Sequence, residues 1–362
     1  MFRLDHIQLT QFRNYIQRAF HFQERVVGIC GQNGTGKTNL LDAIYYLSFS
    51  KSYFSRPDQT NVHHGLMGMR LEGTYLLNGD AQELVFIMRE NSRKELTLNG
   101  DAYTKFSDHL GRFPAVMIAP DDISLIAGTS EERRKLVDSI ISQINRPYLH
   151  ALIQYNKLLL QRNSLMKQWG EHGQIDEMLL EIIDQQLCKH GDFIYAERNQ
   201  FLLGYLQLTG EIYQKISGDA DAVFLQYESR LHQQDMQTLL QQQKQKDRLL
   251  HRTSAGIHKD DLIFQLQEQP FKTEASQGQR KSLLFALKLA EWQILKKEKG
   301  FTPILLLDDV FEKLDEIRMF QLLNWVCTES DGQVFITDTH ASRLKEQMKK
   351  IQSPFQMIEL YL

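Results

Sequence analysis

The sequence predicts an α/β fold in which a mostly parallel sheet carries a phosphate-binding loop and is split by an inserted helical unit. An apolar run at residues 26–30 leads directly into the pattern G-x-x-x-x-G-K-[ST] at residues 31–38. From residue 303 onward, apolar strand-like runs alternate with helix-like segments, as expected for a parallel sheet. Between these two parts, residues 128–250 are mostly helical in pattern.

The N-terminal part is expected to contain a strand, the phosphate loop and a helix. Residues 2–15 alternate loosely between apolar and polar side chains and end in Phe12-Arg13-Asn14-Tyr15. The helix after the loop should end near Ser48. Residues 51–66 have mixed polarity, so we expect an exposed loop there.

An antiparallel subsheet is expected at residues 69–100. Its strand-like runs are punctuated by Asn-Gly pairs at 78–79 and 99–100, and this dipeptide tolerates the positive φ angles of a type I′ hairpin turn. A buried strand at 113–120 should then deliver the Asp pair at 121–122 to a surface.

The final third of the sequence returns to mixed α and β patterning. Residues 257–271 have strand texture, and a helix at 276–295 places Leu283, Leu287 and Ile294 on one buried face. We expect an ATPase-like lobe at 1–125 and 253–362, and a helical lobe or arm at 126–252. The other expected elements are a strand at 303–307, a helix at 315–328, a strand at 333–339, a helix at 341–350 and a strand near 356–361.

Composition narrows the class of protein. The 362 residues carry a net charge of −3 and are 42% hydrophobic, which supports a full globular core and excludes a uniformly basic coat for nucleic acid. The three cysteines form no metal-spaced pair, and no apolar run approaches the roughly 18 residues of a membrane span. We therefore expect a cytoplasmic protein without a membrane partner.

The phosphate-loop pattern predicts a nucleotide site. Its glycines let backbone N–H groups turn inward at a helix N-terminus, where they can cradle phosphates. Lys37 would contact the β- and γ-phosphates and the hydroxyl of Thr38 would hold Mg²⁺. A glycine turn followed by a surface lysine is the alternative. The candidate contacts with ATP are Gly31, Gln32, Asn33, Gly34, Thr35, Gly36, Lys37, Thr38 and Asn39, together with Arg13.

Two adjacent carboxylates end the strand at 303–307. Asp308 can reach the Mg²⁺ held by Thr38, although a strand-terminal Asp can also simply cap a helix. In many ATPases with a phosphate loop, the residue after the metal-binding Asp is a Glu that polarises the attacking water. Asp309 stands at that position. The shorter side chain predicts slow hydrolysis or a different approach of the water. Asp309, Lys37 and His340 are the candidate catalytic residues.

Two further features fit an ABC-type ATPase head. Ser276, Gly278 and Gln279 form a Ser-x-Gly-Gln turn that opens a helix, where it serves either as a second anion site or as an N-cap. In ABC-type heads this turn faces the phosphate loop of a second copy. His340 follows the strand at 333–339, in the place of the switch histidine of these heads, but a lone histidine is also often a surface residue.

Taken together, these motifs resemble the RecF family of bacterial ATPases, which is related to the SMC heads. The resemblance covers nearly the whole chain. It is carried by Phe12–Tyr15 and the phosphate loop, by PDDISLIAGTSEERRKLVD at 120–138, GIHKDD at 256–261, ASQGQRKSLLFALKLAE from residue 275 and PILLLDDVFEKLD at 303–315.

The resemblance implies an ATP-dependent homodimer with Mg²⁺ as its metal. It also implies binding to DNA at junctions of duplex and single strand, and cooperation with RecR and RecO in loading the recombinase. Candidate DNA contacts are local basic clusters, each of which can equally be a solvated helix face. These clusters are Arg133-Arg134-Lys135, Lys244/Lys246/Arg248/Arg252 and Lys296/Lys297/Lys299.

Two rival functions share the same motifs. An ABC transporter subunit would place its signature closer to the loop than the 239 residues between Lys37 and Ser276. A DNA clamp that binds ATP without turnover is made plausible by Asp309 standing where Glu is usual. Stimulation of ATP hydrolysis by DNA, not by a membrane complex, would exclude the transporter subunit. The turnover of an Asp309 variant tests whether the chain hydrolyses ATP or only binds it.

Overall fold

The computed structural model describes residues 2–54, 57–172, 176–217, 223–309 and 316–361, and they group into two compact units. The head unit comprises Met1–Asp122, Lys215–Gly218 and Ser276–Leu362, and the helical unit comprises Ile123–Gln214 and Asp219–Ala275. Residues 310–315, the end of one family-like motif, lie outside the described part of the chain.

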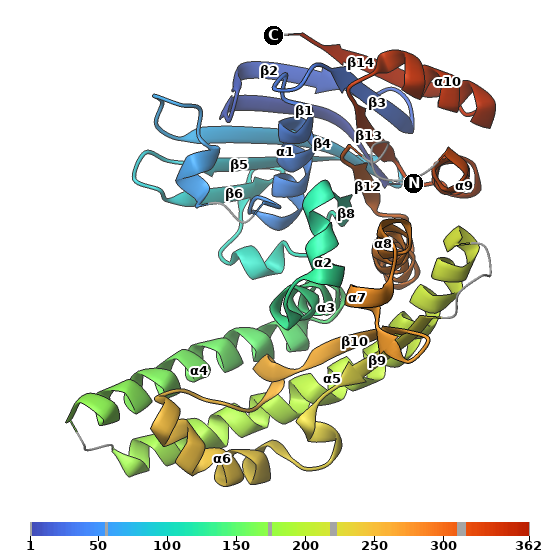
Figure 1. The fold of residues 1–362 in the computed structure, drawn as a ribbon. Helices are drawn as coiled ribbons and strands as arrows, with labels where there is room; N and C mark the ends of the chain where they lie inside the picture. Colours follow the sequence, from blue (N-terminus) through green and yellow to red (C-terminus); the bar gives the residue numbers. More distant parts are fainter. Residues whose placement is uncertain (1, 55–56, 173–175, 218–222, 310–315, 362) are drawn as a thin grey trace. The chain divides into compact units, whose positions relative to one another are not determined.

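The head unit contains a five-stranded parallel sheet in the order β14-β3-β13-β12-β8 (Figure 1). Its inner strands are short and almost wholly apolar, as expected for strands that are covered on both faces. The strands are β3 (Val26–Gly31), β8 (Ala115–Ile118), β12 (Ile304–Leu307), β13 (Val334–Asp338) and β14 (Phe355–Leu360).

A six-stranded antiparallel sheet, in the order β2-β1-β4-β5-β6-β7, completes the β structure of this unit. Asn78 and Gly79 both have positive φ, at 56° and 98°, as a type I′ hairpin requires. The sheet is larger than the subsheet expected at 69–100, because the N-terminal segment forms a hairpin rather than a single strand. Its strands are β1 (Phe2–Phe12), β2 (Tyr15–His21), β4 (Met69–Leu77), β5 (Asp80–Met88), β6 (Lys94–Leu98) and β7 (Asp101–Ala102).

The helices described in the head unit include α1 (Lys37–Phe49), α8 (Gln277–Lys299), α9 (Glu316–Asn324) and α10 (Ala341–Ile351). A turn of π-helix, Trp325–Glu329, follows α9. Buried apolar side chains from both sheets and α1 form one continuous core. This core supports the end of β3, from which the phosphate loop leaves the sheet.

The helical unit is built on α4 (Arg146–His172) and on the 41-residue α5 (Glu177–Ser217), whose last residues, from Lys215, group with the head unit. It also contains α2 (Ser124–Ala127), α3 (Ser130–Ile144), α6 (Met236–Leu250), α7 (Phe271–Glu274), β9 (Val223–Glu228), β10 (Asp261–Leu266) and β11 (Gln269–Pro270). Among the helices that the structure describes, none has the length and apolar character needed to cross a bilayer.

Three local expectations differ from the structure. Residues 253–275, expected in the ATPase-like lobe, group with the helical unit because β10 pairs with β9 and Arg133 of α3 forms an ion pair with Asp261. Within the loop expected to be exposed at 51–66, Asn61 is fully buried. Asp122 does not face a surface either, since it is buried and accepts a hydrogen bond from the backbone N–H of Ala119.

Candidate nucleotide site

The phosphate loop joins β3 to the start of α1. Gly36 has φ of +103°, a left-handed conformation that glycine adopts without strain, and α1 begins at the next residue. The Nζ of Lys37 lies back across the loop and donates to the carbonyl oxygens of Gly31 at 2.8 Å and Gln32 at 3.0 Å. A buried ammonium and a helix N-terminus therefore meet at one concave loop, as binding of an anion requires.

The turn between β1 and β2 braces this loop from the side. Asn14 donates from Nδ2 to the carbonyl of Thr35 at 3.2 Å, and the hydroxyl of Tyr15 donates to the carbonyl of Gly36 at 3.1 Å. A Cβ added to Gly36 would lie 2.6 Å from Nδ2 of Asn14, so the turn and the loop are in close contact. Sequence reasoning did not assign Asn14 and Tyr15 this role.

Arg13, expected to contact ATP, is held by the protein itself. Its Nη2 forms an ion pair at 2.5 Å with Asp42, whose side chain is fully buried, and donates to Ser52 Oγ at 3.0 Å. Its Nη1 donates to Oδ1 of Asn39 at 2.9 Å. Because Asn39 lies in the first turn of α1, Arg13 positions the start of that helix, and Asp42 is a site residue that the motifs do not reveal.

The strand end at Asp308 meets the phosphate loop. The hydroxyl of Thr38 donates to both carboxylate oxygens of Asp308 at 3.0 Å, although the two residues are 270 positions apart. Thr337, at the end of the neighbouring β13, donates to Asp308 Oδ1 at 2.8 Å. The parallel register of β12 and β13 brings these strand ends together, so the expected pairing of Thr38 and Asp308 exists in the fold.

The electrostatic environment of Asp308 suits a divalent cation. Burial raises its pKa to about 6, with a further contribution from the neighbouring carboxylate of Asp309, and the hydroxyls of Thr337 and Thr38 only partly offset this. Lys37 lies near enough to lower the pKa slightly. A hydroxyl and an undercompensated carboxylate side by side are hard oxygen donors of the kind that Mg²⁺ prefers.

Asp309 and His340 lie at the ends of adjacent strands. Asp309 has φ of +46°, uncommon for a residue with a side chain, and its backbone N–H donates to the Oγ1 of Thr337 at 2.9 Å. His340 is exposed and precedes α10, and its N–H donates to Oδ1 of Asp338 at 3.0 Å. Arg343 also pairs with Asp338, so this buried carboxylate anchors the turn that carries His340.

The Ser-x-Gly-Gln turn forms a complete capping box on α8. Ser276 Oγ accepts from the N–H of Gln279 at 3.2 Å, and Oε1 of Gln279 accepts from the N–H of Ser276 at 2.7 Å. Gly278 lies close to Arg318, whose Nη1 would be 2.8 Å from an added Cβ. The two hydrogen bonds of the capping box lie within the turn itself, at the N-terminus of α8.

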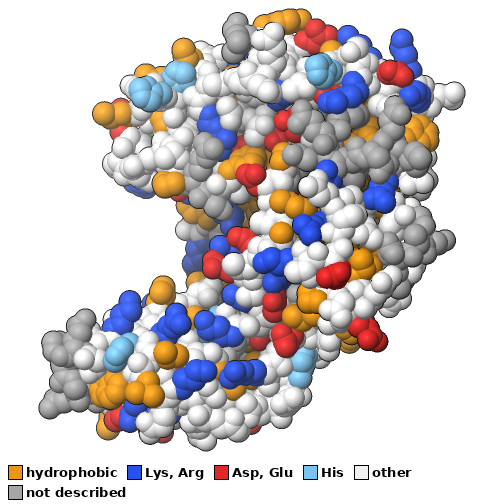
Figure 2. Space-filling model, viewed as in Figure 1, with side chains coloured by type: hydrophobic (Ala, Val, Ile, Leu, Met, Phe, Trp, Pro, Cys, Tyr) orange, Lys and Arg blue, Asp and Glu red, His pale blue; other side chains and the backbone are white. Residues whose placement is uncertain are grey.

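The basic clusters differ in how far they are paired internally. Arg133 forms a bidentate ion pair with Asp261 at 2.7 and 2.9 Å, and Arg134 donates to the carbonyl of Asp260, so both tie α3 to β10. On α6, Lys244 and Arg248 share Glu177 as their partner. Figure 2 shows further Lys and Arg side chains on the face of the helical unit that carries α4 and α6.

Comparison with known proteins places the chain in a family. Residues 3–358 match the family model of the RecF/RecN/SMC N-terminal domain. The DNA replication and repair protein RecF of Flavobacterium johnsoniae is 42% identical over 99% of both chains, and that of Parabacteroides distasonis is 41% identical over 95% of this chain and 93% of its own.

Solved structures agree with these sequence matches. The recombination mediator protein RecF with ATP, described as part of the RecFOR pathway, is 30% identical and superposes with a TM-score of 0.87 over 94% of this chain and 93% of its own. An SMC head domain from Pyrococcus furiosus, 16% identical with a TM-score of 0.56, shares the fold alone. With relatives this similar along nearly its whole length, the chain belongs to the RecF family, on the ABC-type ATPase head fold.

Proposed function

We propose that this chain is an ATP-dependent DNA-binding protein of recombinational repair and replication-fork maintenance, acting in the cytoplasm. The observation that carries the proposal is the 3.0 Å contact between Thr38 and Asp308. It joins the phosphate loop to an acidic strand end as an ATPase requires. The matched RecF proteins, named for DNA replication and repair, support the assignment to DNA.

The nucleotide contacts follow from the loop and its surroundings. Lys37 and the N–H groups of the loop would bind the phosphates of ATP, while Thr38 and Asp308 would hold Mg²⁺. The cation, when bound, neutralises phosphate charge. Arg13 acts from a distance by positioning α1, because its guanidinium is engaged with Asp42 and Asn39.

ATP joins two copies in this proposal. Exposed Ser276 would approach the nucleotide of a second copy, where the positive end of the α8 dipole adds favourable charge. A nucleotide that contacts both copies binds the dimer more tightly and so shifts the equilibrium toward it. Hydrolysis, slow because Asp309 is short, would release the dimer.

DNA would be bound through its backbone, at junctions of duplex and single strand. Arg133 and Arg134 are committed to internal contacts with Asp261 and Asp260, so Lys246 and Arg252 are the better candidates. RecR and RecO are the proposed partners, because the matched RecF structures are described in the RecFOR pathway. A clamp without turnover and a transporter subunit remain the alternatives to be tested.

The solution mass with ATP, without ATP and with gapped duplex DNA tests this function. We expect a dimer that needs ATP and that DNA strengthens. Ser276→Arg should abolish the dimer while the monomer still binds ATP, whereas Thr328→Arg, at another exposed site of the head unit, should dimerise normally. A monomer under every condition would refute the dimer. Loss of ATP binding in Ser276→Arg would place Ser276 in the primary site.

A further inference from the structure

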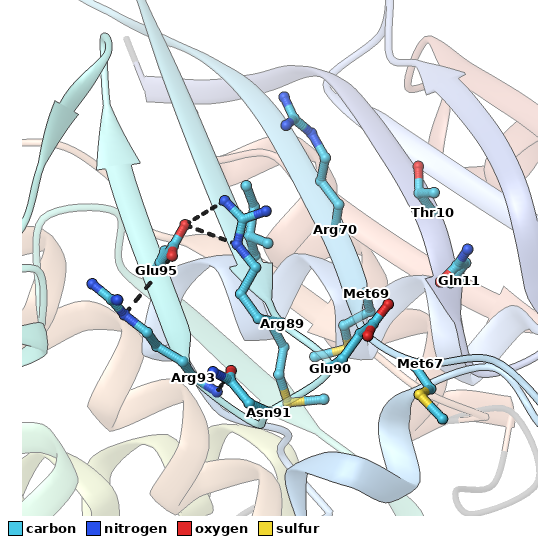
Figure 3. A pocket seen from close by; sticks show the side chains of 13 residues that line it. Thr10, Gln11, Met67, Met69, Arg70, Arg89, Glu90, Asn91, Arg93 and Glu95 are labelled. Atoms are coloured by element: carbon cyan, nitrogen blue, oxygen red, sulfur yellow. Dashed lines mark hydrogen bonds and ion pairs between the residues drawn. The ribbon is translucent and has the colours of Figure 1, made fainter.

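A groove lies on the antiparallel sheet of the head unit, with a volume of about 670 Å³ (Figure 3). The register of four adjacent strands places Thr10, Arg70, Ile87 and Glu95 in one row across it. The volume is in the range of pockets that hold small molecules or short peptide segments. The proposed function above uses none of these residues.

Three guanidinium groups line this groove, and two are held in fixed orientations by carboxylates. Arg70 donates from Nε and Nη2 to Glu72 at 2.7 and 2.9 Å, and Arg89 donates from the same two atoms to Glu95 at 3.2 and 2.8 Å. Arg93 lies 3.9 Å from Glu95, and its side chain is 75% exposed. Oriented, accessible guanidinium groups bind carboxylates and phosphates well.

The other end of the groove carries the exposed apolar side chain of Met67, with Glu90 beside it (Figure 3). Met67 is 72% exposed, whereas Met69 and Met88, which also line the groove, are almost fully buried. Gly68 has φ of +82°, and a Cβ there would lie 2.6 Å from the carbonyl oxygen of Met88, so glycine allows the chain bearing Met67 to pass close to β5. Methionine side chains adapt to varied apolar partners. Figure 3 shows Met67 and Met69 away from the Arg89–Glu95 pair.

This combination favours a peptide over a nucleic acid. Glu95 is paired with Arg89 and Glu90 lies beside Met67, so a continuous phosphate backbone along the groove would meet a carboxylate in both places. A short peptide can place its carboxylates at the arginines alone. The lining includes no aromatic side chain on which a base could stack. We propose that the groove binds a short acidic peptide segment of a partner protein, whose carboxylates contact Arg89 and Arg93 and whose apolar side chain packs on Met67.

Binding of labelled hexapeptides to the full chain, measured by fluorescence polarisation, tests this proposal. One pool contains three Asp or Glu and three Leu, Ile, Met or Phe in all orders. In the matched pool, Asn or Gln replaces every acidic residue. A single-stranded oligonucleotide is the third probe. We expect the acidic pool to contain binders at least tenfold tighter than any in the neutral pool, with or without ATP.

Substitutions inside and outside the groove test where the acidic peptide binds. Arg93→Glu should weaken the best acidic peptide at least tenfold, while Arg112→Glu, exposed elsewhere on the same unit, should not. Met67→Ser should weaken it severalfold, while Leu66→Ser, its neighbour outside the groove, should not. Equal binding of both pools, or binding insensitive to Arg93→Glu, would overturn the proposal. Loss of oligonucleotide binding alone in Arg93→Glu would assign the groove to nucleic acid instead.

Discussion

Arg162 in the helical unit and Asp308 in the head unit show two opposite ways of burying a charge. In the helical unit, the fully buried Arg162 pairs with Asp184 at 2.6 Å and with Asp247 at 2.7 Å, and Arg198 pairs with Asp138 and Asp260. In the head unit, burial raises the pKa of Asp308 to about 6, and its carboxylate accepts hydrogen bonds from the neutral hydroxyls of Thr38 and Thr337.

This difference distinguishes buried charges that stabilise the fold from a buried charge that serves a functional site. Arg162 and Arg198 connect helices far apart in sequence, and their carboxylate partners compensate them within the same unit. Asp308 lies beside the phosphate loop with its charge undercompensated, so it is available to a cation that the chain itself does not supply. Burial of a charge alone therefore does not mark a site, whereas burial without a compensating partner does.

Removing the compensated charge of Arg162 should have the largest effect, and this effect is on the stability of the fold. Arg162→Met leaves Asp247 buried without its cation, so we expect a loss of about 3–5 kcal/mol in the free energy of unfolding. Urea unfolding measures this change. Lys157→Met, exposed on the same helix, should cost less than about 0.5 kcal/mol. An equally small loss in Arg162→Met would contradict the structural role.

The second largest effect is expected on ATP hydrolysis, when Asp309 is replaced. Asp309→Ala should reduce ATP hydrolysis about a hundredfold, because a positioned base is lost, while ATP affinity stays near that of the native chain. A single-turnover assay with labelled ATP measures both quantities. Asp121→Ala, an exposed acidic residue after β8, is the control. Unchanged hydrolysis in Asp309→Ala would remove the assigned role.

The third effect links Asp308 to pH. A carboxyl group whose pKa is raised from 3.8 to about 6 in the folded chain destabilises it when ionised, fully above pH 6 and not at all below about pH 4. In buffer without Mg²⁺, Asp308→Asn should therefore stabilise the chain by on the order of 2–3 kcal/mol at pH 7.5 and change little at pH 4. Thermal unfolding at the two pH values is the measurement, and equal shifts at both would contradict the raised pKa.

The smallest effect concerns the helix cap. Ser276→Ala removes the oxygen that accepts from Gln279 N–H, so we expect a loss of about 1 kcal/mol in stability with ATP binding to the monomer unchanged. Ser276→Asp should restore the cap and the stability. A loss of monomer affinity for ATP would instead indicate that Ser276 contacts nucleotide within its own chain.

Local motifs predicted much of the head unit. The apolar runs at β3, β12 and β13 and the type I′ turn at 78–79 depend on neighbouring residues only, and all are present. Asp308 was expected to reach a metal ion held by Thr38, and the two side chains lie in direct contact, while the metal itself stays a prediction.

Other features depend on contacts between distant residues. The partnership of Arg13 with Asp42 and the bracing of the loop by Asn14 have no signature in local sequence. Similarly, the strand texture of residues 257–271 does not indicate which unit they join, and the pairing of β10 with β9 places them in the helical unit. Charge compensation at Arg162 involves three different helices and could not be inferred from spacing.

The order of strands in the parallel sheet has a consequence for biosynthesis. β3, which carries the phosphate loop, lies between β13 and β14. Both of these neighbouring strands fall within the last 30 residues of the sequence. A ribosome-bound chain therefore exposes both edges of β3 until residues 334–360 have been synthesised, while the helical unit is available to fold earlier. Such unpaired edges are sites of aggregation and chaperone binding. ATP affinity should consequently appear late and abruptly in a series of stalled nascent chains, only after residue 360 has left the exit tunnel.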